Sequence, residues 1–339
     1  MSVKLSLCIA TFNEEKNIHY PLDSAYDLVD EVIIVDGGSI DNTVGIAKSY
    51  GKKIRVFIKD NPSIFHINKQ KAIELARGEW ILQLDADEAL SNELKEEINS
   101  IVISNEVRDL ATERSVKNKD HASLDSSASP RNDKVVAYYI PRKNFFLTRF
   151  LMKGGQYPDY TIRLYRNGYA KFPCKTVHEN VEITPTVISN EVRDLATERS
   201  VKNKNYASLD FSALPRNDIS FIGYLKNPIL HYADPDFSRY LKRWDRYTTL
   251  DAQILTTPIS PPYQGGDSRG GFLMFLDYFF LKPSVTFFSM YFRHLGFLDG
   301  FPGFVFALFS SIRFWTIYTK FWVISKSQLT RNKQYPNNK

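Results

Sequence analysis

Residues 81–90 read ILQLDADEAL, an apolar run that leads directly into three carboxylates. The apolar half is typical of a buried strand, and the acidic side chains follow where that strand would end. Residues i and i+2 of an extended segment point the same way, so Asp85 and Asp87 can approach one site together. Taken alone, the motif fits a divalent-metal site, and it fits slightly better the first turn of a helix, where acidic residues are favoured.

The first hundred residues alternate between apolar runs and helical patterns. The expected strands are LSLCIA (5–10), EVIIVD (31–36), IRVFI (54–58) and WILQLD (80–85). The expected helices are EEKNIHYPLDSAYDL (14–28), NTVGIAKSYG (42–51), NKQKAIELARG (68–78) and SNELKEEINSI (91–101), the last capped by Ser91. Strands rich in Val, Ile and Leu and separated by helices predict an α/β fold with a mostly parallel sheet covered on both faces.

Polar turns follow three of these strands: TFNEE (11–15), DGGSIDNT (36–43) and DADE (85–88). In parallel sheets, ligands bind at the carboxyl ends of the strands. We therefore expect these turns to converge on one ligand site. This context favours a metal and diphosphate site for Asp85 and Asp87, and it leaves Glu88 as support for the start of a helix.

Charge and cysteine usage limit the function classes. The chain of 339 residues carries a net charge of +6, and the part from residue 226 onward alone carries +7. A basic, aromatic C-terminal part favours an anionic membrane or a phosphate-rich ligand over nucleic acid, for which no motif is seen. Cys8 and Cys174 form no paired motif, and the N-terminus does not resemble a secretory signal, so we expect a cytoplasmic protein.

Two polar segments of 32 residues, 102–133 and 187–218, are identical at 28 positions. They are not adjacent, so they cannot stack as solenoid repeats do. Near-identity is easier to explain by recent copying than by shared function, and we interpret both as insertions that surface loops tolerate. The alternative is a paired docking element.

The segments after the first insertion include a strand over 135–146 (VVAYYIPRKNFF), expected to end at its proline, and a helix over 236–255. Residues 272–324 hold 19 of the 47 aromatic residues of the chain. The longest uncharged run there, 300–312, is shorter than the roughly 20 residues that a membrane span needs. We expect an interfacial helix hairpin; a true span and a soluble aromatic core are the alternatives.

Together the motifs TFNEEKNI, VIIVDGGSIDNTVGIAKSYG and ARGEWILQLDADEAL resemble the donor domain of family 2 glycosyltransferases, which have the GT-A fold. Downstream, MKGGQYPDYTIRLYRNGYAKF, VHENV, ILHYA and GFLDGFPGFVFALFS resemble the subfamily of lipopolysaccharide-core beta-glucosyltransferases, which is bacterial. The resemblance covers nearly the whole chain outside the two insertions. It implies a UDP-sugar donor, Mg²⁺ or Mn²⁺, a lipid-linked glycan acceptor and the inner face of the cytoplasmic membrane as a partner.

The resemblance also implies roles for single residues. The residues that it places at the nucleotide-sugar are Ala10, Thr11, Glu14, Asp36, Gly38, Lys69 and Asp85. The residues that it places at the metal are Asp85, Asp87 and His178. The order NKQKA around Lys69 departs from the usual family pattern, which puts any role of Asn68 and Gln70 in doubt.

Such enzymes invert the anomeric centre, with a carboxylate that removes the proton of the acceptor hydroxyl. Asp159, after the glycine-containing segment GGQYP, stands where related enzymes place this base, and Glu179 is the rival. A turn role for Asp159 and a structural role for His178 stay open. Arg163 and Arg166 fit an acceptor phosphate or a solvated face, and His66 and His231 fit structural or peripheral positions.

The resulting domain prediction has six parts: a donor half (1–101), insertion one (102–133), an acceptor and catalytic half (134–186), insertion two (187–218), the end of the catalytic domain (219–260) and a basic aromatic tail (261–339). The predicted function is an inverting, metal-dependent hexosyltransferase. The alternatives are a non-catalytic membrane-associated nucleotide-sugar-binding protein and a sugar-phosphate nucleotidyltransferase. The latter needs a glycine-rich basic loop after the first strand, and the acidic TFNEEKN lacks one.

Overall fold

The computed structural model describes residues 3–103, 135–175, 180–183, 221–256 and 268–334. The two predicted insertions lie outside the described residues, except for positions 102 and 103, which end a helix. His178 and Glu179 also lie outside them.

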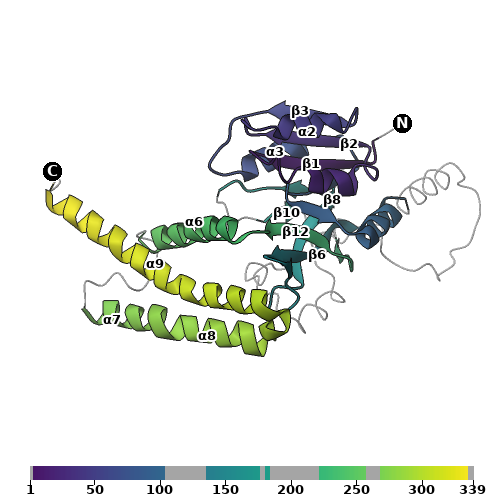
Figure 1. The fold of residues 1–339 in the computed structure, drawn as a ribbon. Coiled ribbons are helices and arrows are strands. Elements are labelled where there is room, and N and C mark those ends of the chain that lie inside the picture. The colour runs from purple at the N-terminus through teal and green to yellow at the C-terminus, as the bar shows by residue number, and fades with distance from the viewer. Residues whose placement is uncertain (1–2, 104–134, 176–179, 184–220, 257–267, 335–339) are drawn as a thin grey trace, which may run out of the picture. The chain divides into compact units, whose positions relative to one another are not determined.

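The first half of the chain has the alternating order that the sequence predicts (Figure 1). The elements are β1 (Leu5–Thr11), α1 (His19–Ala25), β2 (Glu31–Asp36), α2 (Thr43–Ser49), β3 (Ile54–Ile58), α3 (His66–Leu75) and β4 (Trp80–Gln83). β1 pairs in parallel with both β2 and β4, and β2 pairs in parallel with β3. The expectation of a mixed α/β fold with a mostly parallel sheet is confirmed.

The acidic segment after β4 does not start a helix. Residues 86–87 form a turn, and β5 (Glu88–Leu90) follows at once. The helix begins only at residue 92, where the Ser91 hydroxyl accepts a hydrogen bond from the Leu94 N–H at 3.2 Å, as the cap prediction requires. The interpretation of Glu88 as support for a helix start is therefore wrong.

The second half of the chain completes the sheet. Its strands are β6 (Val135–Phe146), β7 (Arg149–Phe150), β8 (Asp159–Arg166), β11 (Phe221–Tyr224) and β12 (Ile229–Asp234), and β9 (Ala170–Lys171) with β10 (Glu182–Ile183) forms a separate pair. The order along the main sheet is β3-β2-β1-β4-β8-β6-β12-β5. β6 runs through Pro141, because the fixed φ of proline is compatible with an extended strand, so the predicted exit at that proline is wrong.

Strand alternation divides the hydrophobic core between the two faces of the sheet. Leu7 and Ile9 of β1 belong to one buried cluster with helix α1, whereas Cys8 belongs to a second cluster with α3. The same split separates Ile34 from Val35 in β2. Successive side chains of a strand point to opposite faces, so continuous apolar strands require cover on both sides.

The chain forms two compact units. Unit 1 comprises residues 1–142 and 160–231, and unit 2 comprises residues 143–159 and 232–339. The boundaries fall inside strands β6 and β12 and at the start of β8.

Unit 2 is mainly helical. Its helices are α6 (Phe237–Leu255), α7 (Ser268–Leu276), the π-helical η3 (Asp277–Leu281), α8 (Lys282–Phe288), the π-helical η4 (Ser289–Arg293), the short η5 (Gly296–Asp299) and α9 (Gly300–Gln334). The elements α7 to η4 follow one another without a break, and α9 returns along α8 and also contacts α6 (Figure 1). The hairpin of the predicted interfacial helix hairpin is thus confirmed, and its place at a membrane interface stays a prediction.

Two stretches of this hairpin are long and apolar enough to cross a membrane: Gly271–Arg293 and Gly296–Ser327. Little of either is buried within the protein. Isolated charges interrupt both stretches, so neither is visible in the sequence as a long uncharged run.

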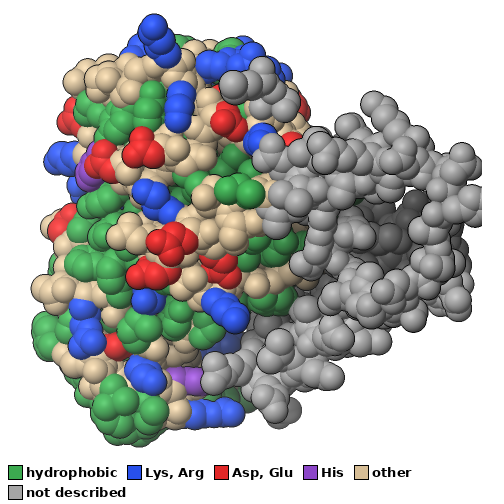
Figure 2. Space-filling view, turned by 90° about the vertical axis from the view of Figure 1, so that its right-hand side faces the viewer, with side chains coloured by type: hydrophobic (Ala, Val, Ile, Leu, Met, Phe, Trp, Pro, Cys, Tyr) green, Lys and Arg blue, Asp and Glu red, His purple; other side chains and the backbone are tan. Residues whose placement is uncertain are grey.

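The face of the molecule drawn in Figure 2 carries Lys and Arg side chains interspersed with Asp and Glu. Hydrophobic side chains lie between them. Outside the grey atoms, this one face shows no broad field of a single charge, and the prediction that nucleic acid is not a partner stays a prediction.

Candidate functional site

The site begins where β1 and β2 end side by side. Thr11 and Asp36 are paired in the parallel register, and the Thr11 hydroxyl donates to the Asp36 carboxylate at 2.8 Å. Asp36 is fully buried. Its other oxygen accepts the N–H groups of Gly38 and Ser39 at 3.0 and 2.7 Å. Asp36 thus shapes the loop after β2, and Gly38 has the φ of +79° that glycine adopts without strain.

The loops after β1 and β2 are joined by further hydrogen bonds. The Asn13 N–H donates to the Ser39 hydroxyl at 2.8 Å, and the Ile40 N–H donates to the Asn13 side chain at 2.9 Å. The Glu14 N–H donates to the hydroxyl of Thr43, the first residue of α2, at 2.7 Å. The predicted nucleotide-sugar residues thus lie together: the partly buried Ala10 and Thr11 end β1, Asp36 ends β2, and Glu14 and Gly38 lie in the two bonded loops that follow.

The Asp85 carboxylate lies between two buried cations. Lys69 Nζ lies 2.5 Å from one of its oxygens, and Arg163 Nη2 lies 2.7 Å from the other. Burial by itself would raise the pKa of Asp85, but Arg163 and Lys69 outweigh it and hold this pKa well below its usual range. Burial lowers the pKa of Lys69, against the opposing effect of Asp85. Asp85 is therefore a fixed anion whose two oxygens both contact cations.

Glu88 is the carboxylate whose role the sequence did not reveal. Its side chain is fully buried, and its Oε1 contacts Arg163 at 2.8 Å and Arg142 at 3.3 Å. Its Oε2 accepts the N–H of Asp85 at 2.9 Å. Glu88 thus fixes the turn between β4 and β5 and helps to neutralise Arg163.

Arg163 differs from both of its predicted roles. It is 6% exposed, and besides the two carboxylates it donates to Gln83 Oε1 at 2.5 Å. It neither lies on a solvated face nor is available for an acceptor phosphate. Arg166, three positions further along β8, is more exposed and pairs with the partly exposed Glu79 at 2.8 Å, which fits the solvated face.

Asp87 lies next to His231, which was expected to be structural or peripheral. The Nε2 atom of His231 lies 3.6 Å from Asp87 Oδ1, and both side chains are partly accessible. His231 reaches this place because β12 pairs with β5, so that His231 stands opposite Glu88 in the register. Nothing in the local sequence around His231 indicates this pairing. His66, in contrast, is buried and stacks on Phe172, which fits a structural role.

The described residues contain no group of three or more His, Cys, Asp and Glu side chains that could hold a metal ion. Within them, Asp87 and His231 are the donors that lie together with some accessibility. The predicted third ligand, His178, lies outside the described residues.

Asp159 is the first residue of β8 and belongs to unit 2. It is half-buried, and Asn144 Nδ2 donates to its carboxylate at 3.2 Å. The rival base Glu179 lies outside the described residues.

Comparison with known proteins finds one family model that matches part of this sequence. Residues 6–170 match the family model of glycosyl transferase family 2. An uncharacterized glycosyltransferase of Rickettsia typhi is 28% identical over 258 residues, which cover 74% of this chain and 68% of that protein. One from Rickettsia bellii is 40% identical over 105 residues, or 31% of this chain and 34% of that protein.

Among solved structures, the mannosyltransferase PcManGT from Pyrobaculum calidifontis, in complex with GDP-Man and Mn²⁺, is similar over 95% of this chain and 88% of that chain, at 11% identity and a TM-score of 0.45. The matched family segment runs from β1 to β9 and contains Asp36, Asp85 and Asp87. Residues 6–170 are therefore similar to the glycosyltransferase family 2 domain, and the chain is a glycosyltransferase.

Proposed function

We propose that this enzyme is an inverting, metal-dependent hexosyltransferase that moves a sugar from a UDP-sugar to a lipid-linked glycan such as a lipopolysaccharide core. The observation that carries the proposal is the Asp85–Asp87 turn. It follows β4 beside two bonded loops, within a family 2 glycosyltransferase domain. Those loops present backbone and small polar groups where β1 and β2 end, which suits a nucleotide.

The donors around this turn fit a divalent cation at Asp87. Mg²⁺ and Mn²⁺ are commonly bound by one or two protein carboxylates together with substrate phosphates. Both Asp85 oxygens contact cations, so we assign the metal to Asp87, with His231 as its neighbour. We assign to Asp85 the binding of a hydroxyl group of the nucleotide-sugar. When bound, the cation supplies positive charge that compensates the leaving diphosphate. Lys69, fixed by Asp85, adds a second positive charge at the same turn.

Asp159 is our candidate for the base that accepts the proton of the acceptor hydroxyl. It begins a strand, is half-buried and has one oxygen oriented by Asn144. A base must hold its carboxylate within hydrogen-bond reach of the hydroxyl, and an orienting amide serves that purpose.

A panel of nucleotide sugars tests the proposal. With Mn²⁺ or Mg²⁺ we expect slow hydrolysis of one UDP-sugar, with water in place of the acceptor. Removal of the metal by a chelator should reduce this hydrolysis by about 100-fold or more, because the leaving diphosphate loses its compensating charge. Turnover that is unchanged by the chelator would contradict the metal assignment. Binding of UDP and metal without any turnover would favour the non-catalytic alternative.

We also propose that the tail hairpin docks on the cytoplasmic membrane from its inner face. Large apolar side chains stand exposed on both helices, among them Leu281 (62%), Phe288 (61%) and Phe301 (71%). Aromatic side chains flanked by Lys and Arg suit the interface of a bilayer. A lipid-linked acceptor would then lie beside the enzyme.

The charges of the hairpin support a lipid partner. Lys282 contacts Asp277 within the first helix at 2.8 Å, while Arg313 and Lys320 of α9 contact Asp251 and Asp245 of α6, each at 2.6 Å. Because charge is costly in lipid, the pairing of these three cations lowers the cost of placing the apolar surface against a bilayer.

Vesicles containing anionic lipid provide the test. The protein should co-sediment with them, and the double variant Leu281→Glu/Phe301→Glu should lower partitioning about tenfold or more, since each lost apolar contact contributes about 1.5–3 kcal/mol. The control is Ile40→Glu, an even more exposed apolar residue of unit 1, which should leave partitioning unchanged. Equal partitioning of the double variant and wild type would exclude this surface.

A further inference from the structure

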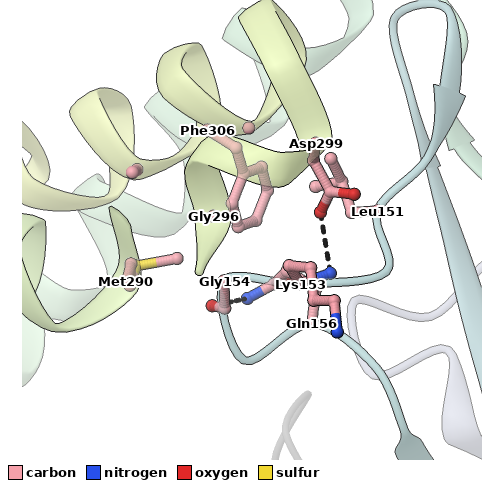
Figure 3. A pocket seen from close by; sticks show the side chains of 10 residues that line it. Leu151, Lys153, Gly154, Gln156, Met290, Gly296, Asp299 and Phe306 are labelled. Carbon is pink, nitrogen blue, oxygen red and sulfur yellow. Dashed lines mark hydrogen bonds between the residues drawn. The ribbon is translucent and has the colours of Figure 1, made fainter. Parts of the chain in front are cut away.

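The turn of the tail hairpin is bonded to the loop that precedes β8. We call residues 293–299 the hairpin turn and residues 151–158 the acceptor loop; both belong to unit 2. The carboxylate of Asp299 accepts the backbone N–H groups of Met152 and Lys153 at 3.0 and 2.7 Å. Figure 3 shows Asp299 pointing from the hairpin toward this loop.

The contact is buried and continues along the loop. Asp299 is 2% exposed, and Arg149 lies 3.8 Å from its second oxygen. The N–H of Gly154 donates to the carbonyl of His294 at 2.9 Å. Three successive N–H groups of the loop are thus bonded to the hairpin turn. An ionised carboxylate that accepts two backbone N–H groups forms stronger hydrogen bonds than a neutral acceptor.

Glycines shape the backbone of both partners. Within the hairpin, a Cβ atom on Gly296 would lie 2.7 Å from the carbonyl oxygen of Met290, and one on Gly303 would overlap the carbonyl oxygen of Gly296, so these glycines allow the hairpin to pack closely on itself at its turn. On the loop side, Gly154 and Gly155 have φ values of +64° and +74°, which favour glycine. The small cavity beside this contact is also lined by Leu151, Gln156 and Phe306.

The acceptor loop leads directly to Asp159, the proposed base, five residues after Gly154. We infer that Asp299 is a positioning residue: it holds the acceptor loop so that Asp159 stands where the acceptor hydroxyl arrives. The same hairpin that docks on the membrane thereby also fixes the position of the acceptor loop. This inference rests on the proposed function, since it concerns the base of that reaction.

Two substitutions at position 299 separate positioning from mere folding. Asp299→Asn retains an oxygen that can accept both N–H groups, whereas Asp299→Leu does not. For Asp299→Leu we expect kcat of donor hydrolysis to fall about ten- to hundredfold, because a catalytic group displaced by about 1 Å loses that much. KM for the donor should stay unchanged, since the predicted donor residues belong to unit 1. Asp299→Asn should stay within about threefold of wild-type kcat.

Hydrogen exchange of the peptide covering residues 147–158 gives a second readout that needs no activity. We expect faster exchange in Asp299→Leu and nearly wild-type exchange in Asp299→Asn. Should the Leu variant not fold, Gly155→Ala strains the exposed side of the same loop without touching Asp299, and the same fall in kcat is expected. Wild-type kcat in a folded Leu variant or in Gly155→Ala, or unchanged exchange in a folded Leu variant, would overturn the inference.

An incorrect proposed function would give a different experimental result from an incorrect role of Asp299. In that case the wild-type protein itself hydrolyses no nucleotide sugar with metal, and the catalytic half of the inference falls with it. The exchange comparison would still decide whether Asp299 holds the acceptor loop.

Discussion

Replacement of Arg163 by Met should lower the free energy of unfolding by about 3–5 kcal/mol, because it removes the buried cation that Asp85 and Glu88 share. Arg163 contacts Asp85 and Glu88 within 2.8 Å and is almost fully buried with Glu88. Methionine fills a similar volume, so the loss reflects charge and hydrogen bonding rather than a cavity. Urea denaturation followed by tryptophan fluorescence measures the effect.

Arg166 provides the matched control. It lies on the same strand and contacts the partly exposed Glu79 at 2.8 Å. Exposed ion pairs contribute about 0–1 kcal/mol, so Arg166→Met should change the free energy of unfolding by no more than that. Equal losses in the two variants would show that the buried charge cluster has no special importance for stability.

The second large effect is expected at Asp87. Asp87→Ala should reduce metal-dependent hydrolysis of the donor by at least about 100-fold, since it removes the proposed carboxylate ligand of the cation. The side chain is accessible enough to meet a ligand and forms no part of the buried cation pairs of Asp85. Turnover with Mn²⁺, measured by release of the nucleotide diphosphate, is the readout.

Asp27, an exposed acidic residue of unit 1, gives the control for loss of negative charge. Asp27→Ala should hydrolyse the donor at the wild-type rate. Titration of the two variants with metal adds a comparison that does not depend on turnover. The affinity for the metal ion should weaken only in Asp87→Ala. Full activity of Asp87→Ala would exclude a metal site at this turn.

The parallel half of the sheet could be predicted from the sequence because its strands are buried on both faces. Continuous apolar runs such as EVIIVD can lie only between two layers of helices, and the polar turns mark the strand ends. The same reasoning placed Thr11, Asp36 and Asp85 at one edge, where β1, β2 and β4 end.

The partners within the site could not be predicted. Arg163 and Glu88 are 75 residues apart, and a buried arginine in a strand reads in sequence like a surface arginine. His231 meets Asp87 only because β12 pairs with β5, a pairing that local periodicity does not encode. Glu88 follows the same rule: acidic residues are common at helix starts, and its buried place at the start of β5 depends on Arg163 and Arg142 far along the chain.

The prediction of membrane spans in the tail from the sequence was limited for a different reason. Arg313 and Lys320 interrupt the apolar run of the tail in sequence, which favours an interfacial hairpin and leaves a true span as an alternative. In the fold, α6 supplies Asp251 and Asp245 to these two cations. Whether a charge interrupts an apolar surface depends on a partner helix some 60–75 residues away, which a window along the chain does not contain.

The balance of the buried cluster around Asp85 constrains how this sequence can drift over generations. Lys69 and Arg163 contact Asp85, while Arg163 and Arg142 contact Glu88. Loss of any one member removes part of the compensation of its partners' charges, whereas the joint loss of a cation and an anion to apolar residues can be almost neutral for folding. Descendants can therefore change these positions in compensating pairs, while each single step is opposed by selection for a stable fold.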